Sequence, residues 1–198
     1  MIHFLDYLGL TVFAISGALA AAEKRVDILG FVLFAIITGV GGGTLRDVLL
    51  DTDIFWIADQ SYIWVCIGAS VATWFFARRF ESLRTPLLWA DALGMALFAV
   101  TGTQKALAFE MPVIVSIGMG MMTASFGSLI RDTLLQRPAV LLEPDIYVTA
   151  ALLGASCYVL LDALSVAEDL ALWISVLAAF GLRAAAIVFG LRLRKFDQ

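Results

Sequence analysis

Apolar and polar positions in this chain are arranged in long blocks. Seven apolar segments are separated by short polar stretches, and the segments span residues 4–22, 28–50, 61–79, 87–107, 112–135, 146–164 and 170–191. A helix needs about 20 mainly apolar residues to cross the hydrocarbon core of a bilayer. The pattern therefore predicts an all-α membrane protein with seven transmembrane helices in a single transmembrane domain, residues 1–198.

Composition agrees with this interpretation and excludes several functions. Hydrophobic residues make up 62% of the chain and charged residues 15%, whereas soluble domains have about 45–50% and about 25%. The net charge is −4, so we expect no nucleic-acid partner. One histidine, His3, and two cysteines, Cys66 and Cys157, offer almost nothing for hydrolysis or a zinc site. We expect neither an enzyme nor a cofactor.

An internal repeat is the most informative pattern in the chain. Arg46-Asp47 recurs 85 residues later as Arg131-Asp132, and each pair follows a run of small residues. The same offset relates Asp6 to Asp91, Gly9 to Gly94, Phe13 to Phe98, Gly17 to Gly102, Leu49 to Leu134 and Tyr62 to Tyr147. Such a gapless match predicts an internal duplication. We place the first repeat at 4–84 and the second at 87–166, followed by an unpaired seventh helix at 168–191.

Each repeat contains three helices, so the second copy enters the membrane from the opposite face. The fold is thus predicted to be a 3+3 inverted repeat plus one extra helix. Lys and Arg residues set the orientation, because cytoplasmic loops carry an excess of them. The side reached after the first, third, fifth and seventh helices carries nine, and the other side carries only Lys105. This predicts a cytoplasmic C-terminus and an N-terminus outside, with Lys105 extending to the interface.

Small residues interrupt the second and fifth helices. Gly41, Gly42 and Gly43 lie in the second helix, and the corresponding stretch of the fifth runs from Ser125 to Ser128. Glycine is about 1 kcal/mol worse than alanine in a helix, so we expect both helices to break here. Broken backbone must face protein or water, which favours an ion pathway. Close packing of intact helices through small residues is the alternative.

The predicted pathway residues are those of the two small-residue segments. They are Gly41, Gly42, Gly43, Thr44, Ser125, Phe126, Gly127 and Ser128. Free carbonyls before each break would suit cations, whereas free N–H groups after it would suit anions. The residues alone therefore leave the sign of the ion open, and we expect no metal beyond transient monovalent cations near the breaks.

Four charged residues follow these segments at membrane depth: Arg46, Asp47, Arg131 and Asp132. Each costs at least about 2.5–3.5 kcal/mol there unless it is paired or hydrated. Adjacent residues on a helix do not face each other, so we predict cross-pairs of Arg46 with Asp132 and of Arg131 with Asp47. The network could line a pathway, clamp the two repeats together, or do both.

Taken together, the duplicated segments Gly42-Gly43-Thr44-Leu45-Arg46-Asp47 and Gly127-Ser128-Leu129-Ile130-Arg131-Asp132 resemble the prokaryotic branch of the trimeric intracellular cation (TRIC) channels. The resemblance implies a homotrimer among membrane lipids in the cell (inner) membrane. It also implies a K⁺-permeable pore through each protomer, lined by the second and fifth helices. Phe126 departs from the glycine pair of the first copy.

One other function fits the same residues. Inverted repeats with half-helices also suit a secondary transporter of a small zwitterion such as glycine, a role associated with some bacterial relatives. A scaffold without transport activity does not explain four charges at membrane depth.

Overall fold

The computed structural model describes residues 2–79, 82–139 and 146–193, and the elements in this part of the chain are all helices. In chain order they are α1 (Ile2–Glu23), α2 (Ile28–Leu49), α3 (Phe55–Ala58), α4 (Ser61–Phe76), the 3₁₀ turn η1 (Ala77–Arg79), α5 (Arg84–Ala108), α6 (Val113–Leu134), α7 (Val148–Ala163) and α8 (Glu168–Phe189). The prediction of an all-α protein is confirmed.

Helix length separates two groups. Among the described residues, α1, α2, α5, α6 and α8 are long and apolar enough to cross a membrane. The apolar helices α4 and α7 have 16 residues each, which corresponds to about 24 Å of helix against a hydrocarbon core of about 30 Å. These two helices occupy the same position in the two predicted repeats, and both are shorter than the apolar segments 61–79 and 146–164.

The ends of the helices show the repeat in the backbone itself. Arg25 and Asp51 adopt positive φ after α1 and α2, and Glu110 and Gln136 do so after α5 and α6, at the same offset of 85 residues. The chain reverses in the same way after α2 and α6, because Thr52 N donates to Asp47 O and Arg137 N donates to Asp132 O. Such helix ends usually carry glycine, because a side chain disfavours left-handed backbone.

This geometry predicts that Gln136→Gly stabilises the protein. A residue with a side chain loses roughly 1–2 kcal/mol in left-handed backbone, and Gln136 has φ 51°. We expect a gain of about 1 kcal/mol, offset in part by the greater freedom of glycine in the unfolded chain. Thermal unfolding in detergent measures it. Gln136→Ala keeps the strain and removes only the side chain, so an equal gain from alanine would contradict this explanation.

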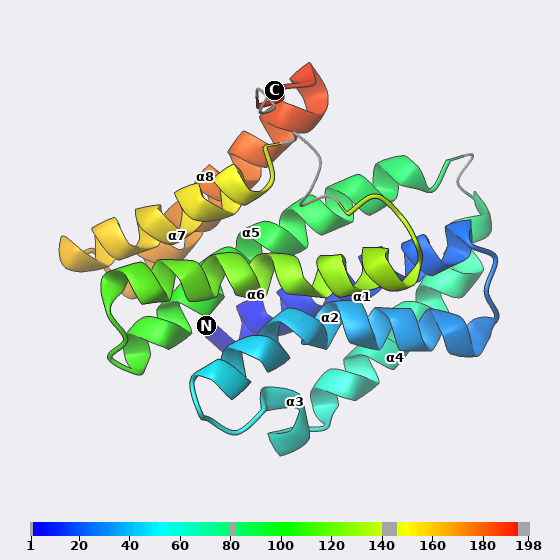
Figure 1. Ribbon diagram of the computed structural model, residues 1–198, viewed down its shortest axis with the longest axis horizontal. Coiled ribbons are helices and arrows are strands. Elements are labelled where there is room, and N and C mark those ends of the chain that lie inside the picture. The colour runs from blue at the N-terminus through cyan, green and yellow to red at the C-terminus, as the bar shows by residue number, and fades with distance from the viewer. Residues whose placement is uncertain (1, 80–81, 140–145, 194–198) are drawn as a thin grey trace, which may run out of the picture.

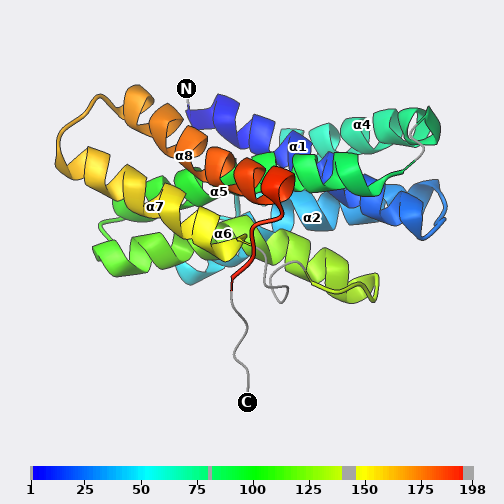
Figure 2. The ribbon, with the colours of Figure 1, turned by 90° about the horizontal axis from the view of Figure 1, so that it is seen from above.

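α1 and α5 form the centre of the bundle. They are the most buried of the five long helices. α4 packs on α1 and α2, and α7 packs on α5 and α6, so the third helix of each half covers the first two. α8 packs on α5 and α7, and Figures 1 and 2 both show it beside α7 at the border of the bundle.

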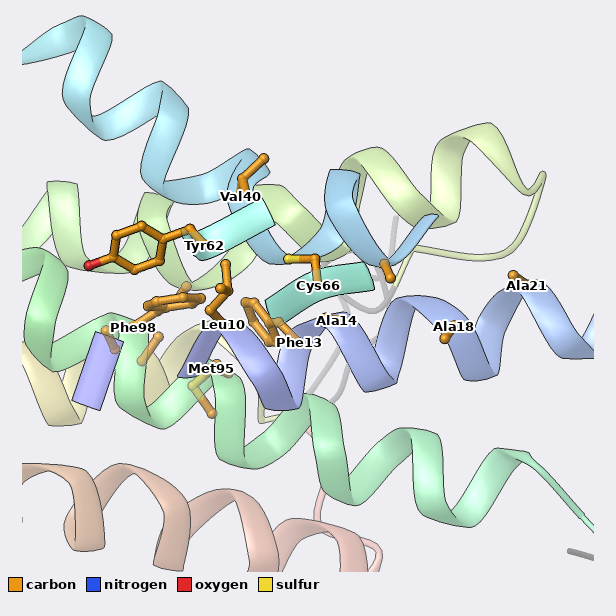
Figure 3. Close-up of a cluster of buried hydrophobic side chains, with 14 of the residues drawn as sticks. Leu10, Phe13, Ala14, Ala18, Ala21, Val40, Tyr62, Cys66, Met95 and Phe98 are labelled. Carbon is orange, nitrogen blue, oxygen red and sulfur yellow. The ribbon is translucent and has the colours of Figure 1, made fainter. Parts of the chain in front are cut away.

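The core is built on contacts between equivalent residues of the two halves. Phe13 and Phe98 meet edge to face, with ring centroids 5.2 Å apart, and Figure 3 shows both rings among the buried side chains. Gly9 lies against the Phe98 ring, and Gly94 lies against the Phe13 ring. The earlier residue of α1, Gly9, meets the later residue of α5, Phe98, while the later residue Phe13 meets the earlier residue Gly94. The two helices therefore run antiparallel where they cross. An inverted repeat requires this relation.

Candidate functional site

α2 and α6 cross at their glycine segments with their backbones in direct contact. A Cβ atom added at Gly42 would overlap the backbone oxygen of Thr123, and one added at Gly127 would overlap the backbone oxygen of Thr38. Thr38 and Thr123, like Gly42 and Gly127, are equivalent residues of the two copies. The contact is therefore reciprocal, and it is antiparallel like that of α1 and α5.

The prediction that these helices break is wrong. α2 is helical without interruption from Ile28 to Leu49, and α6 is helical from Val113 to Leu134. The glycines have a packing role instead, because only residues without side chains let two helix backbones approach this closely. Close packing of intact helices, the alternative kept open above, is what the structure contains.

Hydroxyl groups around the crossing bond within their own helices. Thr38, Thr44, Thr123 and Ser125 each donate to the carbonyl oxygen four residues earlier, at 2.6–2.7 Å. Ser128 donates to Ser125 O at 2.9 Å. Their donor hydrogens are thus used within the protein, while oxygen lone pairs remain able to accept.

The predicted pathway residues face different surroundings. Gly42 and Gly127 lie in the crossing itself, and Gly41 approaches the backbone of Gly127. Gly43 instead faces the ring of Phe55 on α3, and the Thr44 hydroxyl accepts from Trp56 Nε1 at 2.8 Å.

In the second copy, Ser125 and Ser128 are buried and Phe126 is half-buried. Tyr147, just before α7, donates to Ala124 O at 3.2 Å and lies 3.3 Å from the Ser128 hydroxyl. α3 and the start of α7 are therefore fixed to the two small-residue segments.

Asp47 is the centre of one charged cluster, which we call the Asp47 cluster. Its Oδ1 accepts from Arg46 Nε and from Lys105 Nζ, each at 2.8 Å. Its Oδ2 accepts from Phe55 N at 3.0 Å, and the Arg46 guanidinium lies 5.9 Å from the centre of the Phe55 ring. Asp47 is fully buried, whereas the Lys105 side chain is 28% exposed. The cluster ties α2 to α5 and α3.

Arg131 is the centre of the second cluster, the Arg131 cluster. Its Nε donates to Asp132 Oδ1 at 2.8 Å, and its NH2 donates to Asp132 Oδ2 at 3.1 Å. Its NH1 donates to Asp91 Oδ1 at 2.8 Å and also to the Ser16 hydroxyl. All four residues are buried, so two carboxylates surround one guanidinium without contact with solvent.

The predicted cross-pairs, Arg46 with Asp132 and Arg131 with Asp47, are wrong. Because α2 and α6 are antiparallel, Arg46 lies one turn beyond the crossing in one direction and Arg131 lies one turn beyond it in the other. Each arginine instead binds the aspartate next to it in sequence. Both pairs lie in the last turn of their helix, where the long arginine side chain reaches around to its neighbour.

Sequence reasoning missed three partners of these clusters. Asp91 and Ser16 bind Arg131. The sequence held a signal for both, because the equivalent residues of the other copy, Asp6 and Thr101, are also polar. In the structure these two equivalents line a cavity beside Arg46. Lys105 was expected to extend to the membrane interface, yet it binds Asp47. Its equivalent in the first copy is Ala20, so no repeat pattern marked it.

Each cluster borders a cavity. The cavity at the Asp47 cluster has a volume of about 460 Å³, and its walls include two cations, Arg46 and Lys105, and three carboxylates, Asp6, Asp162 and Glu168.

The cavity at the Arg131 cluster has a volume of about 330 Å³ and reaches Asp132, Arg84 and an ion pair of Arg137 with Glu23 at 2.7 Å. The residues that line the two cavities are different. Between them lie the Phe13–Phe98 contact and the α2–α6 crossing.

Comparison with known proteins identifies the architecture. A family model described as "Glycine transporter" matches the chain twice, over residues 3–78 and 88–163. The solved structure of a TRIC channel orthologue from Rhodobacter sphaeroides is 46% identical, with a TM-score of 0.93, and the match covers 96% of this chain and 98% of that one.

Curated relatives are named as membrane proteins. The inner membrane protein YadS of Escherichia coli is 34% identical over 99% of this chain and 96% of its own length. A membrane protein of Vibrio cholerae is 33% identical over 99% of this chain and 83% of its own length. With the five membrane-length helices, these matches make the chain a multi-pass membrane protein. It belongs to the family that the "Glycine transporter" model describes, the prokaryotic branch of the TRIC channels.

Proposed function

We propose that this protein is a monovalent cation channel that conducts K⁺ through a pathway inside each protomer. The observation that carries the proposal is the 460 Å³ cavity with charged walls, which is lined by Arg46, one turn beyond the Gly42 contact of α2 with α6. The likeness to the Rhodobacter sphaeroides channel supports it over nearly the whole chain. The protein is not an enzyme in this account.

The proposed pathway joins the two cavities across the crossing. Gly41, Gly42 and the segment from Ser125 to Ser128 would line it when α2 and α6 separate, and Gly43 and Thr44 would border it on the side of α3. The backbones touch at Gly42 and Gly127, and the Phe13–Phe98 contact fills the adjacent α1–α5 crossing, so in this proposal the pathway is closed here. Intact helices that meet through glycine can slide or tilt without breaking backbone hydrogen bonds, which suits a gate.

We also propose an assembly and a topology for the protein. The assembly is a homotrimer surrounded by membrane lipids, as the names of the similar channels suggest. The repeats are taken as 4–84 and 87–166, with 168–191 as the added helix, and α4 and α7 complete seven spans. The distribution of Lys and Arg places the C-terminus in the cytoplasm and the N-terminus outside, in the inner membrane.

Potassium flux into liposomes tests the proposal. Purified protein is reconstituted into vesicles with an internal K⁺-sensitive dye, and a K⁺ gradient is imposed with a protonophore present, so that protons leave as K⁺ enters and release the charge imbalance. The proposal predicts K⁺ entry far above that of protein-free vesicles. Entry no faster than in empty vesicles, with the protonophore present and the protein correctly folded, would refute it.

Lys105→Gln is expected to raise K⁺ conductance by about twofold at low salt. The substitution removes a positive charge from the wall of the cavity, and a single charge about 10 Å from an ion in a water-like dielectric changes local cation concentration by about this factor. Asp47 keeps two partners, Arg46 and Phe55 N, so the fold should persist. Conductance is measured from unitary currents, and a fall in a folded variant would contradict a pathway through this cavity.

A zwitterion transporter is the second candidate, and one observation favours it. The 460 Å³ cavity combines cationic side chains with carboxylates, so it could hold a carboxylate and an amine together, and the matching family model is described as a glycine transporter. Ion-driven uptake of labelled glycine into the same vesicles, without K⁺ flux, would favour this function over a channel.

A further inference from the structure

One wall of the 460 Å³ cavity joins α5 to the unpaired helix α8. Gln104 on α5 donates through Nε2 to Glu168 Oε1 in the first turn of α8. Thr101 lies one turn before Gln104 on the same face of α5, and both residues line the cavity with Glu168. Glu168 itself is exposed, so this wall is open to water.

Two oxygens of this wall have no hydrogen-bond partner. Thr101 is 2% exposed and Gln104 is 7% exposed, and both Thr101 Oγ1 and Gln104 Oε1 are buried without a partner. Only the amide nitrogen of Gln104 can donate to a carboxylate, so the bond to Glu168 fixes Oε1 as the unused acceptor. Buried acceptors without partners are rare in proteins, and they often mark the site of a water or an ion.

The charges of the cavity favour a cation. Asp6, Asp162 and Glu168 contribute three carboxylates, whereas Arg46 and Lys105 both bind Asp47 and are thus already neutralised in part. In the described ranges no three His, Cys, Asp or Glu residues lie close enough together to hold a metal ion, which argues against a divalent site. One carboxylate with two neutral oxygens suits a weakly hydrated monovalent cation.

We propose that Glu168, Gln104 and Thr101 form a binding site for a monovalent cation, which supplies ions to the pathway. α8 is therefore part of the conduction machinery and not only a packing helix. The site exists at one end of the protein only, because α8 has no counterpart and Leu19 occupies the position equivalent to Gln104. The inference deepens the proposed channel function and rests on it.

Charge removal at Glu168 tests the site by conductance. Glu168→Gln keeps an acceptor for Gln104, and Asp169→Asn is the control, since it removes the same charge from the same helix turn outside the cavity wall. We expect Glu168→Gln to lower unitary K⁺ conductance about two- to threefold in dilute KCl, with little effect of Asp169→Asn. Near 1 M KCl screening should remove the difference. Equal conductance of the two variants in dilute KCl would overturn the site.

Thallium, a K⁺ substitute with strong anomalous scattering, provides a readout independent of currents. Crystals of the wild-type protein grown with Tl⁺ should show a peak between Glu168, Gln104 and Thr101 that is absent from Glu168→Gln crystals. A conducting wild-type protein without this peak would overturn the inference and leave the channel intact. A peak in a protein that carries no K⁺ would support the site while the proposed function fails.

Discussion

Gly42→Ala is expected to lower the free energy of unfolding by about 3 kcal/mol, at the upper end of typical overpacking effects. The new methyl group would overlap the backbone oxygen of Thr123, and backbone cannot move aside as a side chain can. The α2–α6 crossing must open to accommodate it. For a chain of this size, the thermal midpoint in detergent should fall by about 6–12 °C, and Gly127→Ala should give a similar fall because it meets Thr38 in the same way.

Gly118→Ala is the matched control for this experiment. Gly118 lies on α6, as Gly127 does, but a Cβ atom there would meet no atom within 4 Å. Since alanine favours helix over glycine by up to about 1 kcal/mol, this variant should be as stable as the wild type or slightly more stable. If Gly42→Ala and Gly118→Ala had equal midpoints, the close crossing would be wrong.

Arg131→Gln is expected to destabilise the protein by about 3–5 kcal/mol, the usual effect of removing one partner from a buried ion pair. Glutamine leaves the carboxylates of Asp91 and Asp132 without a cation in a fully buried cluster. Loss of folded protein after expression, or a large fall in thermal midpoint, measures the effect.

The same substitution in the first copy should be much milder. Arg46→Gln leaves Asp47 bound to Lys105 and to Phe55 N. Because this carboxylate keeps a cationic partner, we expect a loss of about 1 kcal/mol, the scale of a single hydrogen bond. Equal losses at the two positions would contradict the difference between the clusters. Asp91→Asn, which removes one of two carboxylates from Arg131, should fall between them.

The sequence predicted an all-helical protein, and it identified equivalent residues because duplication leaves a fixed offset. Phe13 and Phe98 could be matched by number alone, and they meet in the structure. Gly42 and Gly127 could be matched in the same way, and they make equivalent contacts with Thr123 and Thr38. The antiparallel relation of the halves follows from the odd number of helices in each repeat. These inferences depend on position along the chain, which the sequence records directly.

The helix breaks and the ion pairs could not be derived in this way. A broken helix and a tight crossing both require small residues, and only the position of the Thr123 carbonyl beside Gly42 distinguishes them. The predicted cross-pairs were wrong because each Arg-Asp pair follows the crossing in its own helix. Since α2 and α6 are antiparallel, the two pairs lie on opposite sides of the crossing. Lys105 lacks a counterpart in the repeat, and its bond to Asp47 depends on how α5 lies beside α2.

The central claim is that ions cross the protein between α2 and α6, and single-channel recording tests it most directly. Purified protein in a planar bilayer with a KCl gradient should give discrete unitary currents that reverse close to the K⁺ equilibrium potential, and Lys105→Gln should increase their size. A folded protein that gives no unitary steps under any voltage, but accumulates labelled glycine along an ion gradient, would contradict the account.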